Sequence, residues 1–131
     1  MTNKELVTGF FMEGYAHHNY EFLMEHMASD YLDHSPCQAK SNKECVDVLK
    51  NTEKNFTDMQ VCIQDMVEED NKVAVRVLFT AIHNGEIFDI APTGKKISFE
   101  ALETFRIHNG LIVESWGYWP DDAIREFLLK E

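Results

Sequence analysis

The 131-residue sequence contains few cysteines, few basic residues and no long hydrophobic run. Its three cysteines, Cys37, Cys45 and Cys62, are odd in number and never form a C-x-x-C pair, which argues against a disulfide framework and a structural zinc site. We therefore expect the protein in the reducing cytoplasm. No apolar stretch approaches the roughly 18 residues of a membrane span. The first residues lack the basic and apolar segments of a signal peptide.

Basic residues are outnumbered, with 12 Lys and Arg against 23 Asp and Glu, and the formal net charge is −11. Without a contiguous basic face, neither nucleic acid nor an anionic membrane is expected as a partner. The acidity is interpreted mainly as a source of solubility. The length, together with an apolar share of 44%, predicts one folded domain over residues 1–131.

The first half of the chain has the spacing of helices. Apolar residues recur three and four positions apart over residues 3–18, which predicts a first helix. A second, short helix is expected from a cap at Asn19 to about residue 28, followed by a brief extended piece over 30–34. Ser41 and Glu44 fit a capping box that opens a third helix, which runs to about residue 56.

The second half alternates apolar and polar residues, which is the period of strands. Strands are expected before a turn at Glu69, over 72–83, over about 95–107 and over 111–119, and Asn109-Gly110 predicts a tight hairpin turn. A short helix follows at the C-terminus. Helices segregated on one face of a curved antiparallel sheet of four main strands make an α+β domain.

Glu103 interrupts an otherwise apolar face of the third of these strands. Alternate residues of a strand share a face, so Glu103 lies among Phe99, Ala101 and Phe105. A carboxylate in such surroundings loses hydration, and its pKa rises unless a partner compensates. General acids and bases are drawn from such environments. The alternative is a buried acid that is paired with a structural His or Arg.

His83 interrupts the matching face of the preceding strand in the same way. It is the candidate to assist Glu103, and a strand-end histidine that bonds to the backbone is an equal alternative. Small residues on the inner face, Ser115 and Gly117 among them, fill little volume beside Trp119. They predict a cavity lined by apolar groups.

The opposite face of the sheet is too apolar for an ordinary solvated surface. A sheet-to-sheet homodimer would cover it. The residues expected there are Leu78, Ile82, Leu102, Ile112, Trp116 and Tyr118.

Four segments carry a resemblance to a known family. Residues 31–36 read YLDHSP, residues 80–85 read TAIHNG, residues 91–95 read APTGK, and residues 103–116 read ETFRIHNGLIVESW. These segments resemble the SnoaL-like polyketide cyclases of the NTF2-like superfamily, which includes the ketosteroid isomerases. The resemblance covers nearly the whole chain.

The resemblance implies a cone-shaped fold in which helices close over the curved sheet, with a pocket at its mouth, usually as a dimer. It implies a pocket acid, here Glu103, that deprotonates carbon next to a carbonyl, an assisting imidazole, here His83, and no metal or organic cofactor. The family carries Asp where this sequence has Glu103. Phe11 stands where the isomerases have a tyrosine. The position of their catalytic base falls near Ser35, which cannot replace a carboxylate. Both differences argue against a ketosteroid isomerase mechanism.

Further residues are candidates for binding a substrate. His34 either lines the pocket or holds its loop through a hydrogen bond, and Trp119 is expected as a pocket wall. Phe11 and Tyr15 face the core from the first helix, where packing is the default role and the Tyr15 hydroxyl is the one chemical handle. The apolar lining is completed by Phe99 and Phe105.

The sequence thus predicts a cyclase-type or isomerase-type enzyme that acts on a small apolar or polycyclic carbonyl compound through Glu103 and His83. The alternative is a non-catalytic domain that binds a small ligand, in which Glu103 forms a structural ion pair and the cavity is small or filled. No metal site is expected, because the spacing of His17, His18 and His26 does not let them share an ion.

Overall fold

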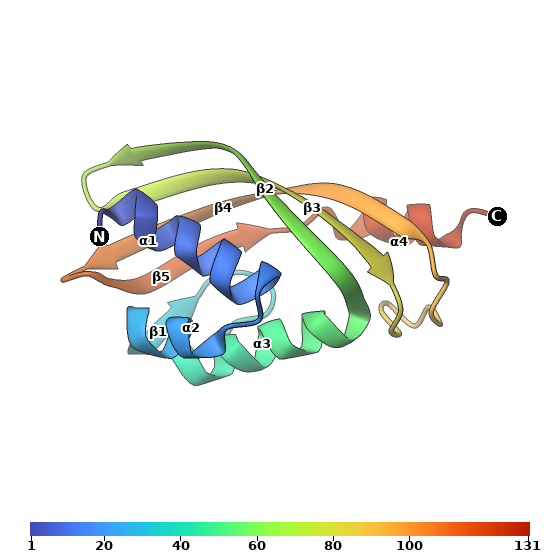
Figure 1. The fold of residues 1–131 in the computed structure, drawn as a ribbon, viewed down its shortest axis with the longest axis horizontal. Coiled ribbons are helices and arrows are strands. Elements are labelled where there is room, and N and C mark those ends of the chain that lie inside the picture. The colour runs from blue at the N-terminus through green and yellow to red at the C-terminus, as the bar shows by residue number, and fades with distance from the viewer.

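Five strands form one sheet in the computed structural model, which describes residues 1–131. The strands lie in the spatial order β1-β5-β4-β3-β2 (Figure 1). Their order along the chain is β1 (Met27–Asp33), β2 (Phe56–Glu69), β3 (Lys72–His83), β4 (Lys96–His108) and β5 (Leu111–Tyr118). Neighbours from β2 to β5 are antiparallel, whereas β1 pairs with β5 in parallel. The predicted α+β class is confirmed.

Strand β1 is the element that the sequence predicted incompletely. Four main strands and a brief extended piece over 30–34 were expected, whereas Met27–Asp33 forms a fifth strand at the edge of the sheet. Its partner lies far along the chain, since Leu32 pairs with Glu114. Hydrophobic periodicity within a short window carries no information about such a distant partner.

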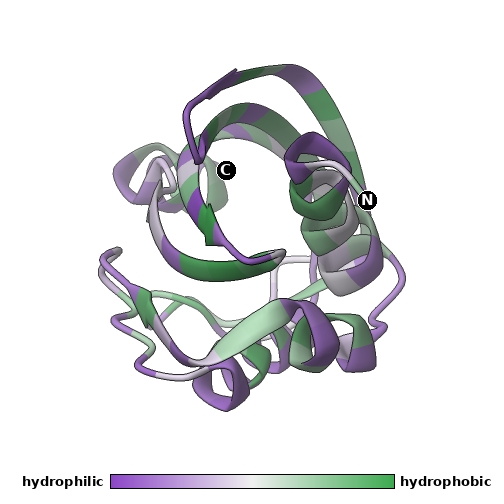
Figure 2. Cartoon of the chain, turned by 90° about the vertical axis from the view of Figure 1, so that its left-hand side faces the viewer, coloured by the Kyte–Doolittle hydropathy of each residue, from purple (hydrophilic) through white to green (hydrophobic).

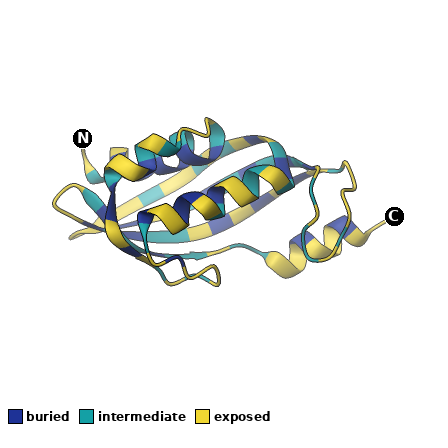
Figure 3. Cartoon of the chain, turned by 90° about the horizontal axis from the view of Figure 1, so that it is seen from below, coloured by how far each residue is buried: buried dark blue, intermediate teal, exposed yellow.

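The helices are α1 (Asn3–Gly9), α2 (Tyr20–His26), α3 (Asn42–Asn55) and α4 (Asp121–Leu129), and Phe10–Ala16 continues α1 as a π-helix, η1. Helices α1, α2 and α3 lie across the concave face of the sheet, and α4 extends beyond one end of it (Figures 1 and 3). The three N-terminal helices and the C-terminal helix agree with the prediction. None of the helices combines the length and the apolar character that crossing a membrane requires.

Local capping explains where two of the helices begin. At α1 the backbone N–H of Glu5 donates to Thr2 Oγ1 (3.1 Å) and that of Thr2 donates to Glu5 Oε1 (2.9 Å), which completes a capping box. At α3 the N–H of Glu44 donates to Ser41 Oγ (3.0 Å), as predicted. The carboxylate of Glu44, however, accepts from the N–H of Lys40 and not from that of Ser41.

The core lies between the concave face of the sheet and the helices, and it contains 27 buried apolar residues. Strand β3 alternates strictly, so that Val73, Val75, Val77 and Phe79 point inward and are at most 2% exposed. Seen end-on, the curled sheet and the helices surround this core (Figure 2). Helix α3 turns one side to the core and the other to solvent (Figure 3).

A β-bulge changes the face on which β5 begins. The pairing of β4 with β5 slips at Ile107, which faces Ile112 and leaves Val113 as an extra residue. Strict alternation predicted Ile112 on the outer face, and this prediction is wrong because the bulge turns the side chain inward, where it is fully buried. Beyond the bulge Ser115 lies on the inner face, as predicted.

Candidate active site

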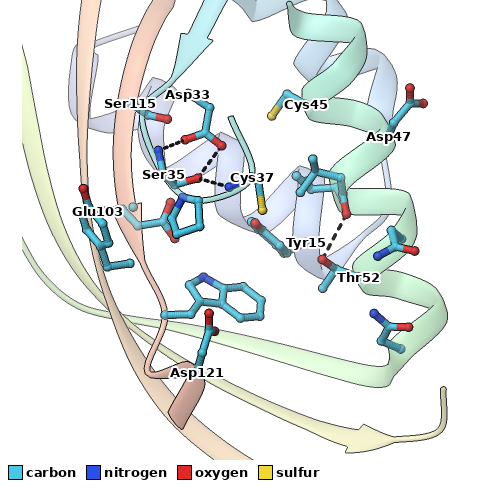
Figure 4. A pocket seen from close by; sticks show the side chains of 18 of the residues that line it. Tyr15, Asp33, Ser35, Cys37, Cys45, Asp47, Thr52, Glu103, Ser115 and Asp121 are labelled. Carbon is cyan, nitrogen blue, oxygen red and sulfur yellow. Dashed lines mark hydrogen bonds between the residues drawn. The ribbon is translucent and has the colours of Figure 1, made fainter. Parts of the chain in front are cut away.

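A cavity of about 560 Å³ lies between the concave face of the sheet and the helices (Figure 4). Its walls come from η1, from β1 and the loop after it, from α3, from the loop between β3 and β4, from β4 and β5, and from the segment that leads from β5 into α4. The polar and ionisable groups among its lining are those of Tyr15, Tyr31, Asp33, Ser35, Cys37, Cys45, Asp47, Asn51, Thr52, Asn55, Glu103, Ser115, Tyr118, Trp119 and Asp121.

Glu103 reaches the cavity from β4, and its position depends on a glycine of the next strand. Glu103 pairs with Gly117 on β5, where an added Cβ would lie 2.8 Å from Glu103 Oε1 and 3.0 Å from its Cδ. Only a residue without a side chain leaves this space free. The residue is partly accessible, but its Oε2 is buried and has no hydrogen-bond partner.

The surroundings of Glu103 favour its protonated form. Burial raises the pKa of this carboxyl to about 7, a hydrogen bond with Trp119 opposes that rise, and the charge of Asp33 adds to it. A carboxyl group with this pKa exchanges a proton readily at neutral pH, because both of its forms are then populated. The expected rise of the pKa is therefore present, and no basic side chain forms an ion pair with Glu103.

Asp33 is a second carboxylate of the cavity, which the sequence reasoning missed. It ends β1, and its two oxygens accept hydrogen bonds from Ser35, one from the backbone N–H (2.8 Å) and one from Oγ (2.7 Å). The signal was present in the sequence, because an Asp two residues before a Ser and just ahead of Pro36 is typical of such a local turn. The turn fixes the start of the loop after β1, which lines the cavity.

Tyr31 and Ser115 form a buried hydroxyl pair that the sequence reasoning also missed. Tyr31 OH lies 2.5 Å from Ser115 Oγ, and the two residues are 2% and 4% exposed. They lie on the neighbouring strands β1 and β5, so the same parallel pairing that escaped prediction brings them together.

Two of the predicted binding residues line the cavity together with Glu103. Trp119 and Tyr15 do so, with ring centroids 6.1 Å apart. Phe11, Phe99 and Phe105 lie behind the wall in the core, and the neighbour of Phe11, Phe10, contacts the cavity in its place. These three aromatic rings therefore support the lining and do not form it.

His83 is buried elsewhere and is not part of this cavity. It pairs with Phe56 on β2 and lies eight positions along β3 from Val75, the partner of Glu103, which is roughly 26 Å at the rise of a strand. Its Nδ1 accepts a hydrogen bond from the N–H of Thr93 (3.1 Å) and lies 2.9 Å from Thr93 Oγ1. The expectation that His83 assists Glu103 is corrected, because the structure separates them along the strand.

His34 faces away from the cavity. Its Nε2 lies 2.7 Å from Glu114 Oε2, and its ring stacks on Trp116 with centroids 4.8 Å apart. Because neighbouring residues of an extended chain point to opposite sides, Asp33 faces inward where His34 was expected to do so. Of the two alternatives for His34, the structure favours the hydrogen-bonded one.

The charge of the cavity lining has one sign. Asp33, Asp47, Glu103 and Asp121 contribute carboxyl groups, and no Lys, Arg or His lines the cavity. The protein has no cluster of three or more His, Cys, Asp or Glu side chains placed to hold a metal ion. The arrangement suits a ligand that is largely apolar and carries no negative charge.

The sequence matches a family model over residues 5–125, and the family is described as SnoaL-like polyketide cyclases. Among solved structures, a putative SnoaL-like polyketide cyclase of Jannaschia sp. CCS1 superposes with a TM-score of 0.90 at 16% identity, covering 98% of this chain and 92% of that one. The putative polyketide cyclase IdmH of Streptomyces antibioticus gives 0.86 at 24% identity, covering 98% and 99%.

The putative hydroxylase AclR of Streptomyces galilaeus gives a TM-score of 0.84 at 24% identity, covering 96% of this chain and 94% of that one. At these identities the likeness shows a shared fold, and proteins described by different activities have it. Among curated proteins, no significant match to the sequence was found.

Proposed function

Since the chain belongs to the SnoaL-like polyketide cyclase family, which has the NTF2-like fold, we propose that it is a cyclase-type or isomerase-type enzyme in which Glu103 transfers a proton. The proposed substrate is a small apolar or polycyclic carbonyl compound. The observation that carries the proposal is the carboxyl group of Glu103, which lies at a cavity wall with its Oε2 unpartnered and its pKa raised to about 7.

The proposed chemistry begins with the carboxylate form of Glu103. It removes a proton from a carbon next to the carbonyl, and the electron pair of that C–H bond moves into an enolate. Returning the proton from Glu103 to another carbon isomerises the compound. If the enolate carbon attacks a second carbonyl of the same molecule, a ring closes and the proton of Glu103 neutralises the new alkoxide. A pKa near the working pH suits both directions of transfer.

The rest of the cavity supports this role for Glu103. The rings of Tyr15 and Trp119 offer flat apolar surfaces to a ligand, and Trp119 also favours the ionised form of Glu103. The carboxylates of the lining disfavour a substrate with a free acid group, because like charges in a poorly solvated cavity repel.

The exchange of carbon-bound protons for solvent deuterium tests the proposal directly. The bicyclic ketone 2-tetralone has acidic protons next to its carbonyl, and NMR in D2O measures their replacement by deuterium. We expect the protein to accelerate this exchange, with a rate that rises with pH and levels off above about 7. Glu103→Gln should slow the exchange about 100-fold to 10,000-fold, because it keeps the shape of the side chain and removes the titrating group.

The control is the fold of the variant, followed by circular dichroism and thermal unfolding. Exchange at an unchanged rate in folded Glu103→Gln would overturn the proposed role of Glu103. A non-catalytic ligand-binding domain is the competing proposal, which predicts binding of the ketone without accelerated exchange. The open cavity and the lack of an Arg or Lys partner for Glu103 support the enzyme.

We also propose that the outer face of the sheet forms a homodimer. Leu102 and Tyr118 face each other across β4 and β5 and are 63% and 58% exposed, and Val67 on β2 is 65% exposed. Apolar side chains gathered on one sheet face favour a partner with the same face. Sedimentation at micromolar concentration should give a dimer that Leu102→Glu dissociates, and a wild-type monomer would contradict the proposal.

A further inference from the structure

The hydroxyl pair of Tyr31 and Ser115 has one more hydrogen than it uses. Each hydroxyl can donate one hydrogen bond, and the single contact between them, 2.5 Å long, consumes one of the two hydrogens. Whichever group donates within the pair, the other O–H remains available. A buried O–H without an acceptor loses the free energy of its hydrogen bond, so an acceptor is expected at this place.

Beyond their mutual contact, neither hydroxyl makes a hydrogen bond within the protein. The thiol of Cys45, which lines the same cavity and influences Tyr31, accepts hydrogen bonds poorly. Both Tyr31 and Ser115 line the cavity. An oxygen atom of a bound ligand is a better acceptor than the thiol and would take its place.

The pair lies beside Glu103 on the inner face of the sheet. Ser115 pairs with Phe105 and Gly117 pairs with Glu103, so Ser115 is the diagonal neighbour of Glu103 across β4 and β5. Such diagonal neighbours are about 7–8 Å apart. This separation accommodates a carbonyl oxygen hydrogen-bonded to the pair, with the adjacent carbon in reach of the carboxylate.

We propose that Tyr31 and Ser115 together donate the hydrogen bond that holds the carbonyl oxygen of the substrate while Glu103 takes the proton from the neighbouring carbon. This inference rests on the proposed function and adds the group that stabilises the enolate oxygen. Negative charge grows on that oxygen as the proton leaves, and a donor already in place stabilises it most in the transition state.

Electrostatics keeps Tyr31 in its donating form. Burial, together with the charges of Cys45, Asp33 and Glu103, raises the pKa of Tyr31 above its ordinary value, against the lowering effect of Ser115. Tyr31 therefore remains protonated at neutral and mildly alkaline pH, where Glu103 acts as a base. It stabilises the oxygen as a donor and does not compete with Glu103 for the proton.

The test compares 2-tetralone with tetralin, the same bicyclic frame without the carbonyl. At pH 8.5 the carboxyl of Glu103 is ionised and donates nothing, so the ketone oxygen reports only other donors. We expect 2-tetralone to bind more tightly than tetralin. The double variant Tyr31→Phe/Ser115→Ala should lower this preference about five- to tenfold, the equivalent of one hydrogen bond.

Infrared spectroscopy of carbonyl-labelled 2-tetralone gives a readout that packing alone does not move. The C=O stretch should shift to lower frequency on binding to the wild type and lose this shift in the double variant. Tyr20→Phe, outside the cavity, is the matched control and should change neither quantity. If the double variant does not fold, 3-fluorotyrosine placed at position 31 makes a stronger donor and should enlarge the shift.

Three results would overturn the inference: an unchanged shift and preference in the folded double variant, an unchanged shift with 3-fluorotyrosine, or a loss that Tyr15→Phe alone reproduces. Failure of the proposed function has another signature, namely exchange that Glu103→Gln does not slow. Failure of 2-tetralone to bind the wild-type protein would count against both.

Discussion

Glu103 and His83 are both ionisable residues on the inner face of adjacent strands, and each has one buried polar atom without a hydrogen-bond partner, but the space around them differs. Glu103 faces Gly117 and an open cavity. His83 is fully buried outside that cavity, is hydrogen-bonded to Thr93 through Nδ1, and has its ring 6.0 Å from that of Phe56. The same interruption of an apolar stripe therefore marks a candidate catalytic group in one place and a structural one in the other.

The size of the cross-strand neighbour separates the two cases. Glycine opposite Glu103 leaves space into which the carboxyl extends, whereas Phe56 opposite His83 fills the corresponding volume. An ionisable residue in an apolar stripe is thus a stronger candidate for chemistry when its partner in the sheet is small. Three substitutions test this difference between the two positions.

The largest effect on stability is expected for His83→Ala. Removing a fully buried ring leaves a cavity and takes the acceptor from the N–H of Thr93, so the free energy of unfolding should fall by about 3 to 4 kcal/mol. Urea unfolding measures this change. The folded variant should exchange the protons of 2-tetralone with the same pH dependence as the wild type. A changed pH dependence would show that His83 takes part in the reaction and would contradict its structural role.

Glu103→Gln, in contrast, is expected to make the protein more stable than the wild type at alkaline pH. The folded pKa of about 7 lies above the ordinary value of 4.5 for a glutamate, so the folded protein binds the proton more tightly than the unfolded chain. The stability contribution of Glu103 is therefore complete below about pH 4.5 and is lost as the pH rises through about 7. Since glutamine does not titrate, the variant should gain up to about 3 kcal/mol over the wild type between pH 4.5 and pH 8.5. Unfolding curves at both pH values check this, and parallel pH profiles for the two proteins would show that Glu103 is not desolvated.

The smallest effect on stability, about 1 kcal/mol, is expected for Gly117→Ala. The new Cβ displaces the carboxyl of Glu103, and the exchange rate should fall about tenfold because the base is misplaced. A Gly117→Ala protein with the wild-type rate would show that this glycine does not position the carboxyl.

Local patterns in the sequence predicted most of the fold. Alternation gave the faces of β3 and β4, the Asn109-Gly110 turn is present with both residues at positive φ, and Ser41 caps α3 as expected. Each of these features depends on residues close together in the chain. The two errors in the sheet depend on pairing between strands: the bulge that turns Ile112 inward and the parallel strand β1.

The candidate site was predicted only in part, because some of its residues are also brought together by pairing between strands. Glu103, Tyr15 and Trp119 were found because strand and helix periodicity gave their direction. Asp33 and the Tyr31–Ser115 pair were missed because they reach the cavity through β1, whose partner is distant in sequence. His83 was placed on the correct face, but periodicity within one strand does not give the register between strands, which separates His83 from Glu103.

The parallel pairing of β1 also sets the order in which the domain is completed. Tyr31 and Ser115 are 84 positions apart, so β1 has no partner in the sheet until β5 has been synthesised, whereas β2, β3 and β4 pair with strands next to them in the chain. Contacts at such long separation form late, because the chain must first lose the entropy of closing a large loop. We therefore expect the wall of the cavity that holds the hydroxyl pair to assemble last, so that a nascent chain that ends before β5 has the candidate base, Glu103, without its candidate site.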